Sequence, residues 1–349
     1  MTEQNVVSII SQTRANSPAV VQAMTPFRDG LLEIPGEIRL RHGGTLSQVR
    51  VAWRLAGAES GPIVVALGGI SADRRVATGD GEERGWWQDL AGEGKALPTE
   101  RCRILSFDYL GGSGGTTGPQ SGEQFPAISS YDQADLLLRL LNHLGIKALH
   151  AFFGASYGGM VGLAFAEKYA DRLLRLCVIS AADRSHPMAT AWRSVQRGVV
   201  RFGLQQGDPN GGLKLARALG MTTYRSHEEF AARFAAAPQQ ESGRLVFPVE
   251  KYLFARGEDF VKRHRPEAYL TLSESIDLHS VNAERIFVAT TVITIAEDQL
   301  VPLSDARAMA ARLPNAQLIE LSSVYGHDAF LKESDLLKPI FARVLEPKS

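Results

Sequence analysis

The sequence predicts an α/β fold in which a mostly parallel central sheet is interrupted by an inserted helical lid. Three observations lead to this prediction: short apolar runs typical of buried strands, helical patterns between several of them, and a later stretch of different texture. A chain of 349 residues exceeds the usual size of one domain, and this length suits one core with an insertion. We therefore predict a core made of residues 1–183 and 283–349, with the lid at residues 184–282.

Five apolar runs are bounded by glycine, proline or charged residues. Each run is too short for a buried helix, and its composition is that of a strand buried on both faces. The runs are Ile63–Leu67, Cys102–Phe107, Ala148–Phe153, Leu173–Ser180 and Phe287–Ile295. Helical patterns lie between several of them, at Tyr131–Leu144 and Met160–Tyr169. Because strands alternate with helices, we expect a parallel, doubly wound sheet.

Three further segments complete this picture. Glu37–Leu55 alternates apolar and polar residues around two adjacent glycines, which predicts an antiparallel hairpin at the edge of the sheet. From about Arg184 to Asn282 the segments are helical and amphipathic, without convincing strand runs, and this region is the predicted lid. A last strand is expected at Ala316–Leu321, so the sheet is completed only after the lid.

Composition narrows the classes of function. Lys plus Arg and Asp plus Glu are 38 each, so the basic excess of a nucleic-acid-binding protein is absent. No apolar window is long enough to span a membrane, and Met1–Val21 lacks the apolar stretch of a secretory signal. Cys102 and Cys177 lie in strand-like segments with no CxxC spacing, which predicts two core thiols and no metal site. We expect a cytoplasmic protein that acts on small molecules without a metal or other bound cofactor.

The sharpest local signal is Gly154-Ala155-Ser156-Tyr157-Gly158-Gly159, a G-x-S-x-G element between a predicted strand and a predicted helix. This context is the one that a nucleophile elbow requires, because its strained and crowded turn tolerates only residues without bulk. The serine hydroxyl would then project at the carboxyl end of a central strand, above a helix N-terminus that favours negative charge. Ser156 is therefore the candidate nucleophile.

A serine hydroxyl needs a base to take its proton, and in this motif's fold the chain order is serine, acid, histidine. Of the histidines that follow the elbow, only His327 lies on a loop after the last strand, whereas the others fall in the predicted lid. The acid should end the preceding strand, where Glu297 and Asp298 stand side by side. We prefer Asp298, which opens a D-x-L-V-P pattern typical of this position, and Glu297 is the alternative.

The negative oxygen that forms during acyl transfer needs backbone N–H donors. In this fold one donor belongs to the residue after the nucleophile, here Tyr157, and another to a loop that follows an early strand. Gly68 and Gly69 follow the strand at Ile63–Leu67, and glycine lets the main chain approach the reacting carbonyl closely. We therefore predict an oxyanion hole made by Tyr157 with Gly68 and Gly69.

Several motifs together resemble the homoserine O-acyltransferases of the α/β-hydrolase fold, and the resemblance spans nearly the whole chain. They are the elbow GASYGGM, the segment ARALGMTTYRS that ends at Ser226, LGGSGGTTGP at Leu110–Pro119 and YGHDAFLKE at Tyr325–Glu333. By position, Ser156, Asp298 and His327 match the triad of that family. The resemblance also implies that Arg217 binds the substrate and that Asp328 contacts its amine, as suits a zwitterionic amino acid.

The resemblance further implies an activity. An acyl-CoA co-substrate would acylate the serine, and the hydroxyl of L-homoserine would then take the acyl group, a step of methionine biosynthesis. A lid that excludes water would favour transfer over hydrolysis, and apolar lid faces could pair two subunits in a homodimer. A simple esterase or thioesterase, and a non-catalytic protein that kept the fold, remain alternatives.

The acyl donor and the acceptor stay open at this level. The family's usual elbow has a second glycine and a methionine where this chain has Ala155 and Tyr157, and its HALTG segment is here VALGGIS. With GWW at Gly85–Trp87 and LSESIDLHS at Leu272–Ser280, the chain looks like a proteobacterial subgroup that transfers succinyl groups. A succinyl carboxylate needs its own cation. The candidates are Arg74, Arg75, Arg193 and Arg197. Acetyl transfer, and serine as the acceptor, are the alternatives.

Overall fold

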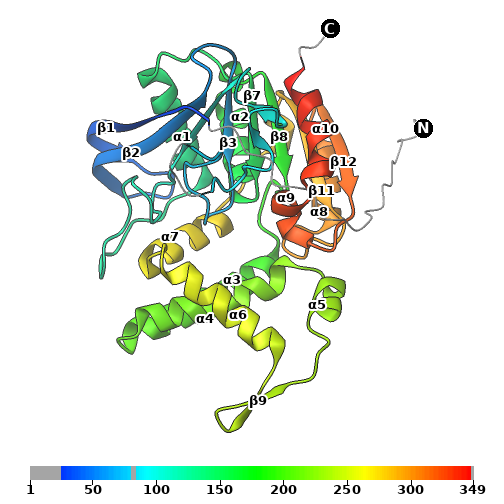
Figure 1. Cartoon of the computed structure of the whole chain (residues 1–349). Coiled ribbons are helices and arrows are strands. Elements are labelled where there is room, and N and C mark those ends of the chain that lie inside the picture. The colour runs from blue at the N-terminus through cyan, green and yellow to red at the C-terminus, as the bar shows by residue number, and fades with distance from the viewer. Residues whose placement is uncertain (1–24, 80–83, 347–349) are drawn as a thin grey trace.

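The computed structural model describes residues 25–79 and 84–346. A central sheet has helices on both faces, and a separate group of helices lies beyond one end of its strands (Figure 1). This arrangement confirms the predicted α/β class with a mostly parallel sheet. The segment Met1–Val21, on which the expectation of a cytoplasmic protein partly depends, lies outside the described residues. Among the residues described, no helix has the length and apolar character needed to cross a membrane.

Within the described residues, the main sheet has eight strands in the order β1-β2-β6-β3-β7-β8-β11-β12. β2 is antiparallel to both of its neighbours, and every pair from β6 to β12 is parallel. The strands are β1 (Phe27–Arg39), β2 (Thr45–Gly57), β3 (Ile63–Leu67), β6 (Arg103–Phe107), β7 (Ala151–Ala155), β8 (Arg175–Ile179), β11 (Ala289–Ile295) and β12 (Ala316–Leu321). The carboxyl ends of the parallel strands therefore meet at one edge, where ligands bind in open α/β sheets.

The observed strands differ from the apolar runs mainly at their ends. β7 begins at Ala151 and not at Ala148, because an apolar run reports burial whereas a strand is defined by pairing. The edge hairpin is confirmed, yet β1 starts at Phe27, well before the expected Glu37. Apolar and polar residues alternate only weakly at the start of β1, so the sequence did not indicate a strand there. The strand forms because these residues pair with the end of β2.

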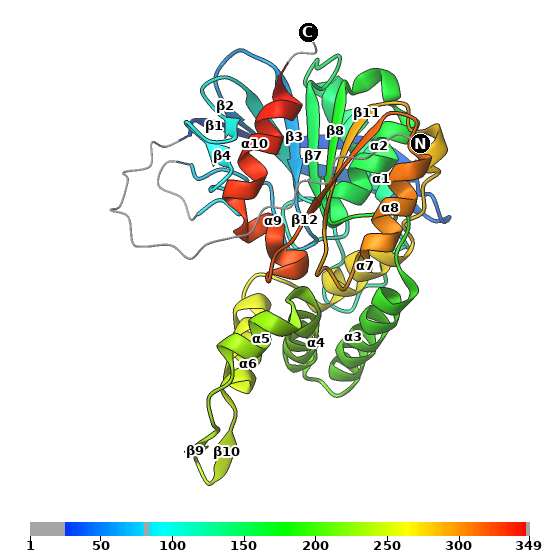
Figure 2. The same cartoon turned by 90° about the vertical axis from the view of Figure 1, so that its right-hand side faces the viewer.

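The two faces of the sheet carry separate apolar layers. Val65 and Leu67 of β3 face a layer that includes α1, α2 and α8, whereas Val64 and Ala66 face α10. This alternation follows from the period of two along a strand. The helices are α1 (Ser130–His143), α2 (Tyr157–Lys168), α8 (Leu303–Arg312), α9 (Ala329–Lys332) and α10 (Ser334–Leu345). Figure 2 shows α10 crossing one face, with α1, α2 and α8 on the opposite side.

Short elements connect these layers. They are β4 (Ala91–Gly92), β5 (Leu97–Pro98) and the 3₁₀ turns η1 (Ala170–Arg172), η2 (Ala283–Arg285) and η3 (Gly326–Asp328). Both cysteines are buried and free, as expected, although Cys102 lies just before β6. Burial raises the pKa of the Cys102 thiol to about 12, and the pKa of Cys177 is raised as well, so neither thiol is a nucleophile at neutral pH.

The segment between β8 and β11 contains five helices and one small hairpin. The helices are α3 (Pro187–Gln205), α4 (Pro209–Tyr224), α5 (His227–Arg233), α6 (Pro248–Val261) and α7 (Pro266–Asp277). We call residues 184–282 the lid, because these helices lie beyond the carboxyl ends of the strands (Figure 1). The expectation of a lid without strands is wrong in one place, since β9 (Gln239–Glu241) and β10 (Arg244–Val246) pair around Ser242 and Gly243. Both turn residues have positive φ, as in the tight turns of β-hairpins. The sequence did not reveal this hairpin, because its short strands are largely polar and leave no apolar run.

Candidate active site

Ser156 stands on a strained turn between β7 and α2. Its φ of 54° lies in the left-handed region, which is uncommon for a residue with a side chain. The glycines around it have no room for a side chain: a Cβ on Gly158 would lie 2.1 Å from the carbonyl oxygen of Leu67, and one on Gly154 would lie 2.4 Å from that of Gly158. The turn thus exists only with glycine at these positions, and it lifts the hydroxyl of Ser156 into the space above the sheet.

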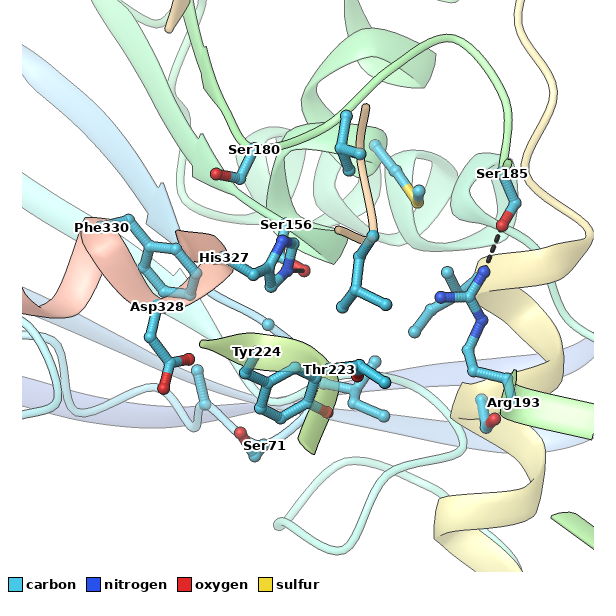
Figure 3. A pocket seen from close by; sticks show the side chains of 18 of the residues that line it. Ser71, Ser156, Ser180, Ser185, Arg193, Thr223, Tyr224, His327, Asp328 and Phe330 are labelled. Atoms are coloured by element: carbon cyan, nitrogen blue, oxygen red, sulfur yellow. Dashed lines mark hydrogen bonds between the residues drawn. The ribbon is translucent and has the colours of Figure 1, made fainter. Parts of the chain in front are cut away.

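Three residues from distant parts of the chain form one hydrogen-bonded line. His327 Nε2 lies 2.9 Å from Ser156 Oγ, and His327 Nδ1 lies 2.8 Å from Asp298 Oδ2. The geometry fits an imidazole that donates from Nδ1 to the carboxylate and accepts the serine proton at Nε2. β7, the loop after β11 and η3 bring these residues together, and Figure 3 shows the His327 ring directed at Ser156.

The two adjacent acids at the end of β11 have different partners. Asp298 is buried, and its second oxygen accepts backbone N–H groups of Leu300 and Val301 at 2.9 and 3.0 Å. Glu297 turns the other way and accepts the backbone N–H of Ser323 at 2.8 Å. The carboxylate that meets the imidazole is therefore that of Asp298, held in place by the turn that follows it.

The environment of His327 affects its protonation. Burial of the ring disfavours the charged form, but the charge and hydrogen bond of Asp298 outweigh burial, and the pKa of His327 is raised above its ordinary value. A neutral imidazole is needed to accept the serine proton, whereas the imidazolium is the form that the carboxylate stabilises. The arrangement can therefore hold the proton that the serine gives up.

The three residues predicted to form the oxyanion hole lie at different positions relative to Ser156. Tyr157 is the first residue of α2, and its aromatic side chain is buried behind the site with its hydroxyl against Ser275. Gly69 adjoins Ser156, because a Cβ there would lie 3.9 Å from Ser156 Oγ. Gly68 lies behind it, where its carbonyl accepts from the Tyr109 hydroxyl at 2.6 Å and from the Gly158 N–H at 2.9 Å. The assignment of these residues to the oxyanion hole stays a prediction.

A cavity of about 280 Å³ opens in front of Ser156, between the strand ends and the lid. Core residues such as Gly69 and His327 line one side, and lid residues such as Arg193 and Arg217 line the other. Figure 3 shows Arg193 across the cavity from the Ser156–His327 pair. Because both walls contribute polar groups, the cavity can offer hydrogen bonds and charges from the core and from the lid to a molecule at Ser156.

Arg217 lies in this cavity without a carboxylate partner among the described residues. Its guanidinium carbon is 4.7 Å from the centre of the Phe260 ring and 5.2 Å from that of Tyr224. The side chain is thus held by aromatic faces, and its single hydrogen bond is a long one of 3.4 Å to the Tyr224 hydroxyl. A cation oriented in this way keeps N–H donors for an incoming carboxylate.

Asp328 also lines the cavity, and it has a partner that the sequence reasoning missed. Arg225 donates from Nε to Asp328 Oδ2 at 2.9 Å, and Arg225 itself is buried. The signal was present, since Arg225 belongs to the TYRS segment, but nothing in the sequence paired it with a residue so far along the chain. A substrate ammonium at Asp328 would share the carboxylate with this arginine.

The four arginines considered for a second carboxylate have different positions. Arg74 pairs with Asp108 at 2.6 Å, away from the cavity, and Arg75 does not line it either. Arg193 and Arg197 both pair with Asp277, at 2.7 and 2.6 Å, which leaves two positive charges against one negative charge. Among the four, only Arg193 lines the cavity of Ser156.

Comparison with known proteins extends these findings. A family model described as the alpha/beta hydrolase fold matches residues 62–334. A homoserine O-succinyltransferase of Xanthomonas campestris is 42% identical over 94% of this chain and 87% of its own length. A serine O-succinyltransferase of Litchfieldella anticariensis is 32% identical over 91% of this chain and 98% of its own length. A homoserine O-acetyltransferase of Clavibacter michiganensis is 31% identical, covering 99% of both chains.

Solved structures agree at the level of the fold. A homoserine O-acetyltransferase from Bacillus anthracis superposes with a TM-score of 0.83 at 19% identity, covering 94% of this chain and 99% of its own. The esterase E22 superposes with a TM-score of 0.82 at 20% identity, covering 92% and 100%. By the extent of its sequence matches, the chain belongs to the homoserine O-acyltransferase family of the α/β-hydrolase superfamily.

Proposed function

We propose that this protein is a homoserine O-succinyltransferase, which moves the succinyl group of succinyl-CoA to the hydroxyl of L-homoserine in methionine biosynthesis. The observation that carries the proposal is the 42% identity, over nearly the full length, to a relative with that name. The relatives named for acetyl transfer to homoserine are less similar, at 29–33% identity. We further propose a homodimer, as the family resemblance implied, and a cytoplasmic location, as the composition of the chain suggested.

In the first half-reaction Ser156 Oγ attacks the thioester carbonyl while His327 Nε2 takes the serine proton. The tetrahedral intermediate collapses, the C–S bond breaks, and His327 returns the proton to the departing CoA thiolate. A succinyl ester of Ser156 remains. Asp298 stabilises the imidazolium that exists between these steps, and backbone N–H groups near Tyr157 and Gly69 face the negative oxygen.

In the second half-reaction the homoserine hydroxyl gives its proton to His327 and attacks the ester. Arg217 binds the amino-acid carboxylate, and Asp328 binds the ammonium together with Arg225. Collapse of the intermediate breaks the bond to Ser156 Oγ, which recovers its proton from His327. Because lid residues form one wall of the cavity and limit the access of water, water competes poorly with the acceptor for the acyl-enzyme.

The donor and acceptor can be tested with a panel of succinyl-CoA and acetyl-CoA against L-homoserine and L-serine. We expect CoA release to be fastest with succinyl-CoA plus L-homoserine, with O-succinylhomoserine as the product detected by mass spectrometry. The serine O-succinyltransferase relative makes L-serine the main rival acceptor. Equally rapid CoA release without any amino acid would instead identify a thioesterase and end the transferase proposal.

Arg193 is the proposed partner of the succinyl carboxylate. Replacing it with glutamine should lower kcat/KM for succinyl-CoA by about tenfold or more, because a charge-assisted hydrogen bond is lost. Acetyl-CoA lacks that carboxylate, so its kcat/KM should fall much less, and Arg197 still pairs with Asp277. The measurement is the ratio of the two kcat/KM values. Parallel losses with both donors would mean that Arg193 supports the lid and does not select the donor.

A further inference from the structure

A second cavity of about 240 Å³ lies beside the one in front of Ser156. The two cavities share a wall, formed by the segment 70–72 together with Arg263 and His264. On its far side the second cavity is lined by Gly112, Ser113 and Gly114. These residues belong to the glycine-rich LGGSGGTTGP segment, for which the proposed mechanism has no use. The second cavity therefore adjoins the active-site cavity and reaches a loop without an assigned role.

Most charged groups around the second cavity are already paired. Arg75 pairs with Asp73 at 3.1 Å. Asp108 accepts from Arg74 at 2.6 Å, and a Cβ on Gly114 would lie 2.5 Å from the Asp108 carboxylate, so the glycine-rich loop fits closely over this ion pair. The two acids at this cavity are thus neutralised by neighbouring arginines, and they contribute no net negative charge.

Arg263 is the exception. Its guanidinium makes no hydrogen bond or ion pair within residues 25–79 and 84–346, and it is exposed at the junction of the two cavities. The nearby acid Asp259 is already paired with Arg256 and Lys262, each at 3.1 Å. Arg263 therefore leaves an uncompensated positive charge where the second cavity meets the first.

The neighbouring His264 adds no charge to this junction. Its ring stacks on Phe260 with centres 3.8 Å apart, and Nδ1 donates to the carbonyl of Phe260 at 3.0 Å. Burial, together with the charges of Arg217 and Arg263, lowers the pKa of His264 to about 4, so the ring is neutral at physiological pH. The wall that the two cavities share thus contains an uncharged ring at His264 and, beside it, the charged guanidinium of Arg263.

The size of the first cavity limits what it can hold. At about 280 Å³ it is smaller than the pockets that enclose drug-sized ligands, which start near 300 Å³. Its walls at Arg193, Arg217 and Asp328 already face the groups assigned to the acyl chain and the acceptor. The backbone from Gly69, beside Ser156, to Asp73 borders the first cavity at one end and the second cavity at the other.

We propose that the second cavity receives the distal, phosphate-bearing part of the CoA thioester, with Arg263 as the cation that pairs with a phosphate group. Arginine suits this role because its planar guanidinium binds phosphate oxygens through two donors and keeps its charge. The inference rests on the proposed function, since it needs a CoA thioester as the donor. Arg263 would then contribute to the binding of the donor without contacting the acyl group or the acceptor.

The test compares succinyl-CoA with S-succinyl-N-acetylcysteamine, a thioester that carries the same acyl group but no phosphate. In Arg263→Glu we expect KM for succinyl-CoA to rise about fivefold or more, because attraction is replaced by repulsion at an exposed site. KM for the short thioester and for L-homoserine should stay unchanged. The matched control is Arg201→Glu, which makes the same charge change at an exposed position of α3 that lines neither cavity.

A second readout is the dependence on salt. KM for succinyl-CoA should rise with ionic strength in the unaltered protein and rise less in Arg263→Glu, since salt screens an exposed ion pair. Equal KM values for succinyl-CoA in the two proteins, or equal rises for both thioesters, would overturn the assignment of Arg263 while leaving the proposed function intact. Failure of the unaltered protein to use succinyl-CoA at all would overturn both.

Discussion

Replacing Ser156 with alanine should reduce transferase turnover by about 10⁴-fold or more, since the attacking oxygen is removed and no acyl-enzyme can form. The fold should persist, because the Ser156 hydroxyl contributes one hydrogen bond, to His327, at the edge of a cavity. The measurement is CoA release from succinyl-CoA in the presence of L-homoserine. A fluorophosphonate probe, which reacts with activated serines, should label the unaltered protein and fail to label Ser156→Ala.

The matched control is Ser180→Ala in the same cavity. Ser180 also has positive φ and is buried, but its hydroxyl has no hydrogen-bond partner among the described residues. This variant should keep probe labelling and most of the turnover. If Ser156→Ala kept a turnover near that of Ser180→Ala, a different nucleophile would be at work. If the probe labelled neither the unaltered protein nor either variant, the protein would be non-catalytic.

Replacing Asp298 with asparagine should lower kcat by roughly 10³–10⁴-fold. The change keeps the size of the side chain but removes the charge that stabilises the imidazolium, and an amide can hold the ring in the wrong tautomer. Glu297→Gln is the control, because the structure directs that carboxylate to Ser323 and away from His327. Its activity should stay close to that of the unaltered protein, and the reverse order of effects would assign the acid to Glu297.

The same two variants should differ in their effect on the pH profile. Activity requires neutral His327, so it is lost as pH falls through the pKa of that residue. Because Asp298 raises this pKa, the acidic limb of kcat/KM should lie above pH 6.5, the ordinary value for histidine. Removing the carboxylate charge in Asp298→Asn should move the limb of the residual activity to lower pH. Glu297→Gln should leave it in place.

The fold and the candidate triad were accessible from sequence because each leaves a local signature. Buried strands produce apolar runs, and an elbow needs glycines at fixed spacing around Ser156. Several histidines follow the elbow, and His327 was selected because, of these, it alone lies on a loop after the last predicted strand. The preference for Asp298 over Glu297 rested on a weak sequence pattern. The structure supplies the physical reason, since two backbone N–H groups hold the Asp298 carboxylate in place.

Other features of the site had no local signature. Four arginines were equal candidates for a succinyl carboxylate, and only the position of α3 brings Arg193 into the cavity. The pairing of Arg225 with Asp328 joins residues 103 positions apart, and the free charge of Arg263 matters only because two cavities meet beside it. Each of these depends on how the lid packs over the core.

The sequence by itself determined the order of most main-sheet strands and the strand–turn–helix of the elbow with its candidate nucleophile, because these follow from short-range periodicity and steric limits within a few residues. The tertiary structure alone decided which charges face Ser156 and which are neutralised elsewhere. The physical reason is that electrostatic pairing depends on separation in space, which falls to about 3 Å only after distant segments have packed together.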